Sequence, residues 1–357
     1  MKNFERGFFR LQRAVEGIPD RVPFTSQMHE FAMVWSGISG NKFYTNADVF
    51  VSGILKTAKD FDFDIPSLGY DAYNIEAEAL GQELTFLEGQ APAANNTLPL
   101  ISEKKDLLYL KPPVTGSAGR MPFVLDVYRI YREQTGISPA LQFCAPFSLA
   151  VLLRGYTNFM QDLYSDKDFA HNLLNFLTEE VIAPWINVQK EEFPESISAQ
   201  GADALCSLPM VNMEIIQSYS IPYIHRLREL CGVEISVTNW WGESCANNID
   251  EFLELKLKVA SGLIRVQDPD VAKVGPRVIK AFAVKHNLVL ELGLGDVILC
   301  QGNKEKIVER IRNYIGQAAE GGRFILYFCS LNADTPPENV RTAVAAVKEY
   351  GEYEIQH

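Results

Sequence analysis

The sequence predicts a (β/α)8 barrel, the TIM-barrel fold, formed as a single domain over residues 1–357. Three observations support this prediction. The chain of 357 residues has the length of one large α/β barrel. Short apolar runs that are rich in β-branched residues recur along the chain, and we identify eight. Helical patterns separate most of these runs, and such alternation is typical of parallel α/β folds.

The predicted strands are these short apolar runs. In chain order they are Val22–Thr25, Asp64–Leu68, Ala140–Phe143, Asp203–Leu208, Glu234–Thr238, Gly262–Val266, Leu288–Leu292 and Arg323–Phe328. An open doubly wound sheet is the alternative fold. It lacks support because no Gly-x-Gly-x-x-Gly pattern follows an early strand. The cluster Gly293-Leu294-Gly295 lacks the third glycine, and we interpret it as a tight turn after a strand.

Helices are predicted where apolar residues return every three or four positions. The clearest are Pro122–Gln134, Lys167–Lys190 and Asn303–Ala319. A further helix start follows the last strand. Thr335 and Glu338, three positions apart, form a capping-box pattern around Pro336. The end of the chain is therefore expected to run strand, loop, helix.

Composition excludes several classes of protein. Hydrophobic residues make up 47% and charged residues 22% of the chain, as in ordinary globular proteins. The net charge of -12 disfavours binding to nucleic acids and to anionic membranes, which both need basic surfaces. No apolar run is long enough to cross a bilayer, and the charged N-terminus does not resemble a signal peptide, so we expect a cytoplasmic protein. The six cysteines are widely spaced, which favours neither a disulfide framework nor a zinc-finger motif.

In a (β/α)8 barrel, chemistry occurs at the carboxyl ends of the strands, so the residues that follow each predicted strand are candidates. The candidate catalytic residues are His29, Glu30, Asn239, Glu243 and Cys329, and the candidate substrate-binding residues are Gln27, Tyr70, Phe147, Met210, Met213, Trp240 and Trp241. The adjacent His29 and Glu30 suit acid–base or metal chemistry, or simply a helix start. Trp240 and Trp241 either line a ligand pocket or pack beneath loops. Cys329 is either functional or a small buried apolar residue.

Several motifs, in a fixed order from Asp20 to Tyr350, resemble the uroporphyrinogen decarboxylase superfamily. They are Asp20-Arg21-Val22-Pro23, Ala77-Glu78-Ala79-Leu80-Gly81, Ala145-Pro146-Phe147-Ser148-Leu149-Ala150, Gly201-Ala202-Asp203 and Asp334-Thr335-Pro336-Pro337-Glu338-Asn339-Val340. The superfamily includes corrinoid-dependent methyltransferases, among them the O-demethylase type that performs the first methyl transfer. The resemblance implies a (β/α)8 barrel, which agrees with the strand pattern.

Two departures from the superfamily narrow the activity. Decarboxylases carry arginines after the first strand to hold a tetrapyrrole's carboxylates, whereas Thr25–Phe31 contains none. Decarboxylation would need other arginines to face the pocket, and Arg120, Arg154 and Arg265 are the candidates, although Arg265 alternates with apolar neighbours and also fits an outward position. Decarboxylation remains the first alternative activity.

The second departure concerns zinc. Thiol-methylating, second-step enzymes of the superfamily hold zinc with a His-x-Cys-Gly motif and a distant cysteine. Here Asn239-Trp240-Trp241-Gly242 replaces the motif, and Cys329 is the ligand retained. The three-ligand site is therefore broken. Zinc bound by Cys329 with His29, Glu30 or Glu243 stays open, as does a methylcobamide-dependent second-step reaction.

The resemblance thus favours a first-step methyltransferase. Such an enzyme moves a methyl group from a small methylated donor, best a phenyl methyl ether, to a cobalt(I) corrinoid (a cobalamin-type cofactor) on a partner protein. The candidate aromatic and methionine residues would form the pocket, and His29 or Glu30 would protonate the leaving group, with Tyr70 as a further donor. A quaternary amine is a competing donor through cation–π attraction. A barrel that binds ligands without catalysing a reaction also remains possible. The chain could in addition form a homodimer.

Overall fold

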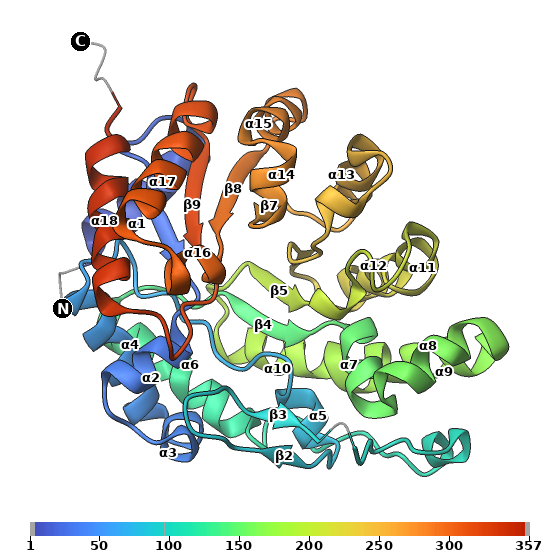
Figure 1. The fold of residues 1–357 in the computed structure, drawn as a ribbon. Coiled ribbons are helices and arrows are strands. Elements are labelled where there is room, and N and C mark those ends of the chain that lie inside the picture. Colours follow the sequence, from blue (N-terminus) through green and yellow to red (C-terminus); the bar gives the residue numbers. More distant parts are fainter. Residues whose placement is uncertain (1–3, 96, 354–357) are drawn as a thin grey trace.

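The computed structural model describes residues 4–95 and 97–353. Figure 1 shows a parallel sheet in the interior with helices arranged around it, which is the (β/α)8 class that the sequence predicts. The described strands are β1 (Phe24–Ser26), β2 (Leu84–Thr85), β3 (Ala93–Ala94), β4 (Leu141–Cys144), β5 (Ser198–Ala202), β6 (Glu234–Val237), β7 (Leu263–Gln267), β8 (Val289–Leu294) and β9 (Phe324–Phe328). Two of them, β2 and β3, form a separate antiparallel pair.

The helices surround the strands. They are α1 (Glu5–Glu16), α2 (His29–Trp35), α3 (Gly40–Thr45), α4 (Ala47–Asp60), α5 (Ile75–Ala79), α6 (Met121–Thr135), α7 (Pro146–Arg154), α8 (Tyr156–Ser165), α9 (Lys167–Phe176), α10 (Ala183–Glu192), α11 (Met213–Tyr219), α12 (Ile221–Cys231), α13 (Ile249–Leu257), α14 (Asp270–Val274), α15 (Pro276–Lys285), α16 (Asp296–Gln301), α17 (Lys304–Ala318) and α18 (Pro337–Tyr350). Short 3-10 helices lie at η1 (Lys104–Leu108), η3 (Ala204–Cys206) and η4 (Glu243–Cys245), and η2 (Leu177–Ile182) is a π-helix. None of the described helices is both long and apolar enough to span a bilayer.

The parallel strands form two hydrogen-bonded sheets among the described residues. One has the order β1-β9-β8-β7 and the other the order β4-β5-β6. At the seam between β6 and β7, a side chain replaces strand pairing. Nζ of Lys256 donates to the carbonyl oxygens of Trp240 at 2.8 Å and Arg265 at 2.7 Å. It also pairs with the buried Glu243. Lys256 therefore joins the two sheets at this seam.

The second seam, between β1 and β4, contains the segment predicted as the second strand. The strand prediction for Asp64–Leu68 is wrong, because the segment has no ladder. Pro66 has no amide hydrogen to donate, and side chains make the connections instead. The amide of Ser26 donates to Oγ of Ser67 at 3.2 Å, and Nε2 of Gln142 donates to the carbonyl of Leu68 at 3.5 Å. The segment still occupies the expected position between β1 and β4.

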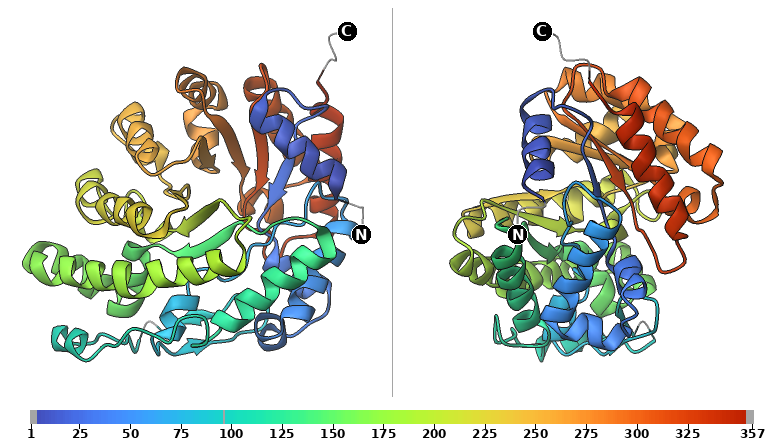
Figure 2. Two further views of the ribbon diagram at one scale, coloured as in Figure 1. Left: turned by 180° about the vertical axis from the view of Figure 1, so that it is seen from behind. Right: turned by 90° about the vertical axis from the view of Figure 1, so that its left-hand side faces the viewer.

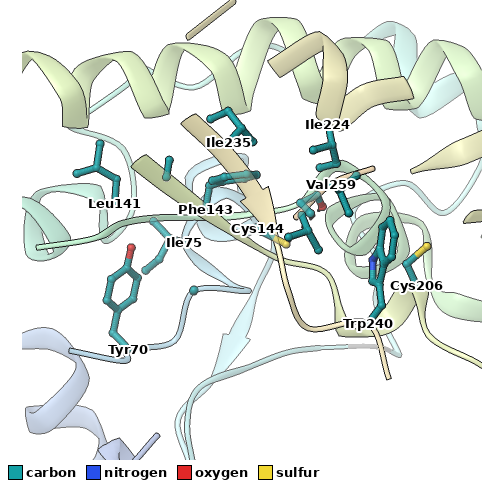
Figure 3. Close-up of a cluster of buried hydrophobic side chains, with 14 of the residues drawn as sticks. Tyr70, Ile75, Leu141, Phe143, Cys144, Cys206, Ile224, Ile235, Trp240 and Val259 are labelled. Atoms are coloured by element: carbon teal, nitrogen blue, oxygen red, sulfur yellow. Dashed lines mark hydrogen bonds between the residues drawn. The ribbon is translucent and has the colours of Figure 1, made fainter. Parts of the chain in front are cut away.

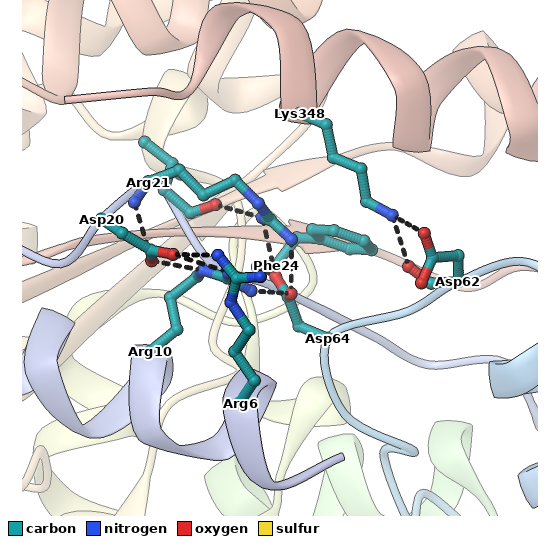
Figure 4. A network of polar contacts seen from close by, with 9 residues as sticks. Arg6, Arg10, Asp20, Arg21, Phe24, Asp62, Asp64 and Lys348 are labelled. Carbon is teal, nitrogen blue, oxygen red and sulfur yellow. Dashed lines mark hydrogen bonds and ion pairs between the residues drawn. The ribbon is translucent and has the colours of Figure 1, made fainter. Parts of the chain in front are cut away.

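Asp64 anchors the start of this segment, as Figure 4 shows. Its carboxylate accepts from Nη1 of Arg10 at 2.5 Å and from both Nη atoms of Arg21. It also accepts from the amide of Phe24 at 3.1 Å. The buried carboxylate thus ties α1, β1 and the segment together.

The predicted fourth strand, Asp203–Leu208, is also wrong. The strand is β5, immediately before it, and η3 begins at Ala204. The sequence of β5 is Ser-Ala-Gln-Gly-Ala, which lacks the apolar run that marks the other strands. Gly201 is required in β5 because a Cβ atom there would lie 2.8 Å from the ring of Phe143 and 3.0 Å from Val237. Tertiary packing, rather than propensity, makes this segment a strand.

The helix predictions for Pro122–Gln134 and Asn303–Ala319 are confirmed by α6 and α17. Lys167–Lys190 is helical throughout, but the π-helix η2 interrupts it just before Pro184, which cannot donate to the preceding turn. The prediction of a capping box at Thr335 and Glu338 is wrong. The helix α18 begins at Pro337 with Pro336 as its N-cap, and the hydroxyl of Thr335 bonds to Asn332 instead.

The helix α1 closes the amino-terminal end of the barrel. Ala14 packs with Val289 and Ile325 in a second apolar cluster, which Leu11 and Leu263 complete. These β-strand residues stand at or next to the amino-terminal starts of β7, β8 and β9. Figure 2 shows α1, in blue, beside these strands. The open end of the barrel is therefore at the carboxyl ends of the strands.

Candidate active site

The interior face of the four-stranded sheet carries polar residues above the apolar floor formed with α1. Along β7, Ile264 and Val266 belong to the main hydrophobic core, so Arg265 and Gln267 share the opposite face, which lines the barrel. The register pairs Arg265 with Glu291 and Gln267 with Gly293. Two layers result, a charged layer nearer the floor and a neutral polar layer nearer the mouth.

The lower layer is an ion pair. Nε of Arg265 donates to Oε2 of Glu291, and Oε1 of Glu291 accepts from the hydroxyl of Thr25 at 2.9 Å. The guanidinium lies 4.7 Å from the centre of the Tyr327 ring. Burial is the largest effect and favours neutral Arg265, but the opposing contributions, led by the Glu291 carboxylate, together raise the pKa of the guanidinium. Arg265 therefore stays charged inside the barrel.

The upper layer brings Gln267, Cys329 and Gln27 together. The thiol of Cys329 donates to Oε1 of Gln267, and the hydroxyl of Tyr327 donates to Oε1 of Gln27 at 3.1 Å. Burial raises the pKa of the Cys329 thiol to about 12. Gly293 makes this layer possible, because a Cβ atom there would lie 2.5 Å from Cβ of Gln267. The layer thus offers neutral hydrogen-bonding groups at neutral pH.

His29 adjoins the upper layer but is neutral. Its Nε2 accepts from Nε2 of Gln27 at 3.3 Å, which places the ring proton on Nδ1, 2.7 Å from the hydroxyl of Tyr44. Burial lowers the pKa of His29 to about 4. At neutral pH the ring can orient Gln27, but it has no readily transferred proton.

Glu30 points toward a different segment. Its Oε1 accepts from the amide of Ala91 at 2.8 Å, so it holds the loop before β3 against α2. Burial raises the pKa of this carboxyl group, and the amide of Ala91 opposes the shift. Its side chain is half-buried, unlike that of His29.

The opposite wall comes from the end of β6 and the loop before α5. Nδ2 of Asn239 donates to the hydroxyl of Tyr73 at 2.8 Å, and Oδ1 of Asn239 accepts from the amide of Asp203 at 2.9 Å. Tyr73 also accepts from the amide of Ala204 at 3.0 Å. Tyr73 therefore connects the end of β6 with the chain that follows β5.

The two tryptophans are placed differently. Trp240 is 1% exposed and lies in the buried cluster of Figure 3, where its Nε1 donates to Oδ2 of Asp203 at 2.9 Å. Asp203 also accepts from Ser148 and Ser220, and burial raises its pKa to about 6. Trp241 is half-buried, with Nζ of Lys256 5.5 Å from its ring centre. Trp241, not Trp240, is the ring with exposed surface.

The other candidate pocket residues lie apart from the barrel layers. Phe147 is fully buried against Phe159, and Tyr70 is buried with its hydroxyl 3.0 Å from that of Tyr128. Met210 is 47% exposed. Met213 lines an outer groove of about 370 Å³ with residues of α11 and α13. The structure therefore brings Gln27, His29 and Cys329 together, and places these four elsewhere.

The residues around Cys329 do not fit a zinc site. Its polar neighbours are the amide of Gln267 and the hydroxyl of Ser330, and neither group is a usual zinc ligand. Glu243 lies at the β6–β7 seam, bonded to Lys256, where burial raises its carboxyl pKa and Lys256 offsets only part of the rise. Among the residues with described positions, no three His, Cys, Asp or Glu side chains are grouped to hold a metal.

All three arginines considered for carboxylate binding have carboxylate partners, and they differ in where they lie. Arg120 pairs with Asp71 and Glu78, and Arg154 pairs with Asp162. Arg265 is different. It points into the barrel, and its outward position, left open by the sequence, is wrong.

Sequence reasoning did not select Tyr73 or Glu76, and it placed Gln267 after the sixth predicted strand without assigning it a role. Glu76 is fully buried, its Oε1 accepts from the amide of Cys144 at 2.9 Å, and its Oε2 has no partner among the described residues. Burial raises its pKa to about 8, so it is largely protonated at neutral pH. Among these three residues, Gln267 had a usable signal, because it directly follows the sixth predicted strand.

The fold and site define a parallel α/β barrel with a polar, neutral constellation at its open end. The sequence matches the family model described as uroporphyrinogen decarboxylase (URO-D) over residues 10–350, and the chain belongs to this family. Its structure is similar to that of a methyltransferase from Methanosarcina mazei, with a TM-score of 0.77 and 20% sequence identity, over 98% of this chain and 99% of that chain. This likeness establishes the shared fold.

A more distant structural match is a B12-independent methionine synthase from Shewanella sp. W3-18-1 in complex with selenomethionine. It has a TM-score of 0.49 and 12% identity, over 87% of this chain and 88% of that chain. No curated protein matched the sequence.

Proposed function

We propose that this chain is a methyltransferase that moves a methyl group from a small methylated donor, best a phenyl methyl ether, to a cobalt(I) corrinoid carried by a partner protein. The observation that carries the proposal is the upper layer of the barrel. Gln27, Gln267, Tyr327 and Cys329 present neutral hydrogen-bonding groups beside one another. Such a layer suits a neutral ether, whose oxygen needs hydrogen bonds as its methyl group leaves.

The charge of the barrel disfavours the decarboxylase alternative. A porphyrinogen carries several carboxylates and needs several cations. Here Arg120 and Arg154 have carboxylate partners, and Arg265 is paired with Glu291. One paired guanidinium is a poor match for a polyanion.

A second-step, thiol-methylating reaction is disfavoured for a different reason. Activation of a thiol in that reaction depends on zinc, which lowers the thiol pKa. The neighbours of Cys329 do not supply the nitrogen, sulfur and carboxylate ligands that zinc prefers. We therefore assign no step to zinc.

Arg265 also favours an ether over a quaternary amine. Its side chain retains 18% exposure inside the barrel, whereas that of Glu291 retains 3%. The accessible charge of the pair is therefore positive. A cationic donor would be repelled from this position, and the guanidinium already occupies one face of the Tyr327 ring.

The proposed reaction forms one bond and breaks one. The electron pair of cobalt(I) attacks the methyl carbon, the carbon–oxygen bond breaks, and its electrons remain on the aryl oxygen. The products are methyl-cobalt(III) and a phenol after protonation. The chain positions the ether near the upper layer and donates hydrogen bonds to the leaving oxygen. We assign the proton to solvent, because His29 is neutral, Glu30 is bonded to the amide of Ala91, and Tyr70 is bonded to Tyr128.

The test is an anaerobic optical assay. The purified protein is mixed with a cobalt(I) corrinoid, free or on a carrier protein, and with an aromatic methyl ether, a methylamine, a quaternary methylammonium compound or a methylated thiol. Conversion of the cobalt(I) spectrum to methyl-cobalt(III) with the ether alone is the expected result. No conversion with any donor, while a known methyltransferase converts the same corrinoid, would refute the proposal.

A further inference from the structure

Arg265 has hydrogen-bond donors without acceptors. A guanidinium carries five N–H groups, and only Nε–H of Arg265 donates to a described residue, the carboxylate of Glu291. Nη1 and Nη2 donate to none of the described side chains or carbonyls, and neither is among the fully enclosed unpaired atoms. Four N–H groups therefore face accessible space inside the barrel.

The guanidinium is held in one orientation. Glu291 binds its Nε edge, and the hydroxyl of Thr25 fixes Glu291 from the far side. The Tyr327 ring covers one face at 4.7 Å. These contacts leave the Nη edge as the free side, already ordered before any ligand arrives, so little conformational entropy is lost on binding.

A ligand that binds the Nη edge of Arg265 must enter from the open end of the barrel. Beneath Arg265, the floor residues Leu263, Val289 and Ile325 pack against Ala14 of α1. They offer only apolar side chains. Above Arg265 stand Gln267 and Cys329, on the path from the open end.

We infer that Arg265 binds a carboxylate group of the methyl donor, and hence that the donor is an aromatic methyl ether that also carries a carboxylate. The ether part of this inference rests on the proposed function. The carboxylate part rests on the contacts of Arg265 alone. Two parallel N–H groups match the two oxygens of a carboxylate in a bidentate pair.

The spacing of the layers indicates where the methyl group would lie. Gln267 follows Arg265 by two residues on β7, which is about 6–7 Å along the strand. A benzene ring spans a similar length between opposite substituents. A carboxylate on Arg265 would therefore place a methoxy group at the opposite ring position beside Gln267 and Cys329, in the neutral upper layer.

The inference is tested by calorimetric binding to the full chain without corrinoid. The ligands are 4-methoxybenzoate and its neutral counterpart 4-methoxybenzamide, which have nearly the same shape. We expect the carboxylate to bind at least tenfold more tightly than the amide. Equal affinities, or tighter binding of the amide, would overturn the inference.

Variants assign the difference to Arg265. Substitution R265K keeps the positive charge but removes the two parallel N–H donors of the guanidinium. It should weaken carboxylate binding about tenfold without changing amide binding. The double variant R265M/E291Q removes both charges, leaves no unpaired buried ion, and should abolish the preference for the carboxylate. Substitution E291Q alone should tighten carboxylate binding. The matched control R226M removes an exposed arginine of a surface pair and should leave both affinities unchanged. A carboxylate preference that survives R265M/E291Q would overturn the inference.

The outcomes separate this inference from the proposed function. Methyl transfer from neutral ethers, with no preference for the carboxylate, would refute the Arg265 subsite and leave the methyltransferase in place. Carboxylate binding that depends on Arg265, without methyl transfer in the optical assay, would support the subsite and refute the methyltransferase.

Discussion

The thiol of Cys329 donates a hydrogen bond to Oε1 of Gln267, across the strand that separates them. Gly293 of β8 lies between β7 and β9 and has no side chain to keep the two residues apart. The contact identifies Cys329 as a protonated thiol that helps to shape the upper layer.

Cys329 should react slowly with alkylating agents. Burial raises its pKa to about 12, so its thiolate fraction at pH 7.5 is very small, and the thiolate is the reactive form. We expect iodoacetamide to modify the exposed Cys245 much sooner than Cys329. Peptide mass spectrometry over a time course measures both sites in one sample. Equal rates at the two cysteines would contradict the assignment.

Substitution D64N should destabilise the fold strongly. It removes the charge that Arg10 and Arg21 share in a buried position, and breaking such a pair costs about 3–5 kcal/mol. The matched control is D62N, whose partner Lys348 is half-buried while Asp62 is exposed, and which should cost less than about 1 kcal/mol. Chemical denaturation of both variants measures the difference. Similar losses would show that Asp64 is not the anchor.

Substitution H29Q should make the protein less sensitive to acid. Burial lowers the pKa of His29 from 6.5 to about 4, so between these pH values the unfolded chain binds the proton more readily than the folded one. The free energy of unfolding therefore falls as the pH drops from 6.5 to 4, by up to about 3 kcal/mol from this residue. Above pH 6.5 the residue contributes no pH dependence. Glutamine keeps an acceptor and a donor but does not titrate.

Denaturation curves at several pH values from 7.5 to 4.5 measure the effect of H29Q. The difference between wild type and variant should change with pH in this window alone. A constant difference would mean that His29 is protonated equally in both states.

Substitution G293A should disturb the upper layer. The added Cβ atom would lie 2.5 Å from Cβ of Gln267. Such overpacking typically lowers the free energy of unfolding by about 1–3 kcal/mol. Methyl transfer should fall with it, because Gln267 and Cys329 must move. The control is G316A in α17, where a Cβ atom meets nothing within 4 Å and helix propensity should stabilise by up to about 1 kcal/mol. An active, fully stable G293A protein would contradict the layered site.

Strands with continuous apolar patterns could be predicted from the sequence, and others could not. β8 and β9 are buried at every position, so their apolar runs are unambiguous. β5 escaped detection because its small and polar residues gain their strand conformation from neighbours such as Phe143. The segment at Asp64–Leu68 shows the reverse, since its apolar residues predict a strand that Pro66 and side-chain bonds replace.

The candidate site was predictable in position but not in detail. The rule that chemistry lies at strand ends located Gln27, His29 and Cys329. It could not distinguish Trp240 from Trp241, because their burial depends on Asp203 and on the direction of the chain after β6. Nor could it decide whether Arg265 points inward or outward, because that direction depends on the sheet face that β7 presents to the core.

The central claim is tested most directly by isotope transfer. An aromatic ether labelled with ¹³C in its methyl group is incubated anaerobically with the protein and a cobalt(I) corrinoid, and the corrinoid is analysed by mass spectrometry. We expect one labelled methyl group on cobalt for each phenol released, and loss of both products without the protein. An unlabelled corrinoid that methyl iodide still methylates would contradict the account.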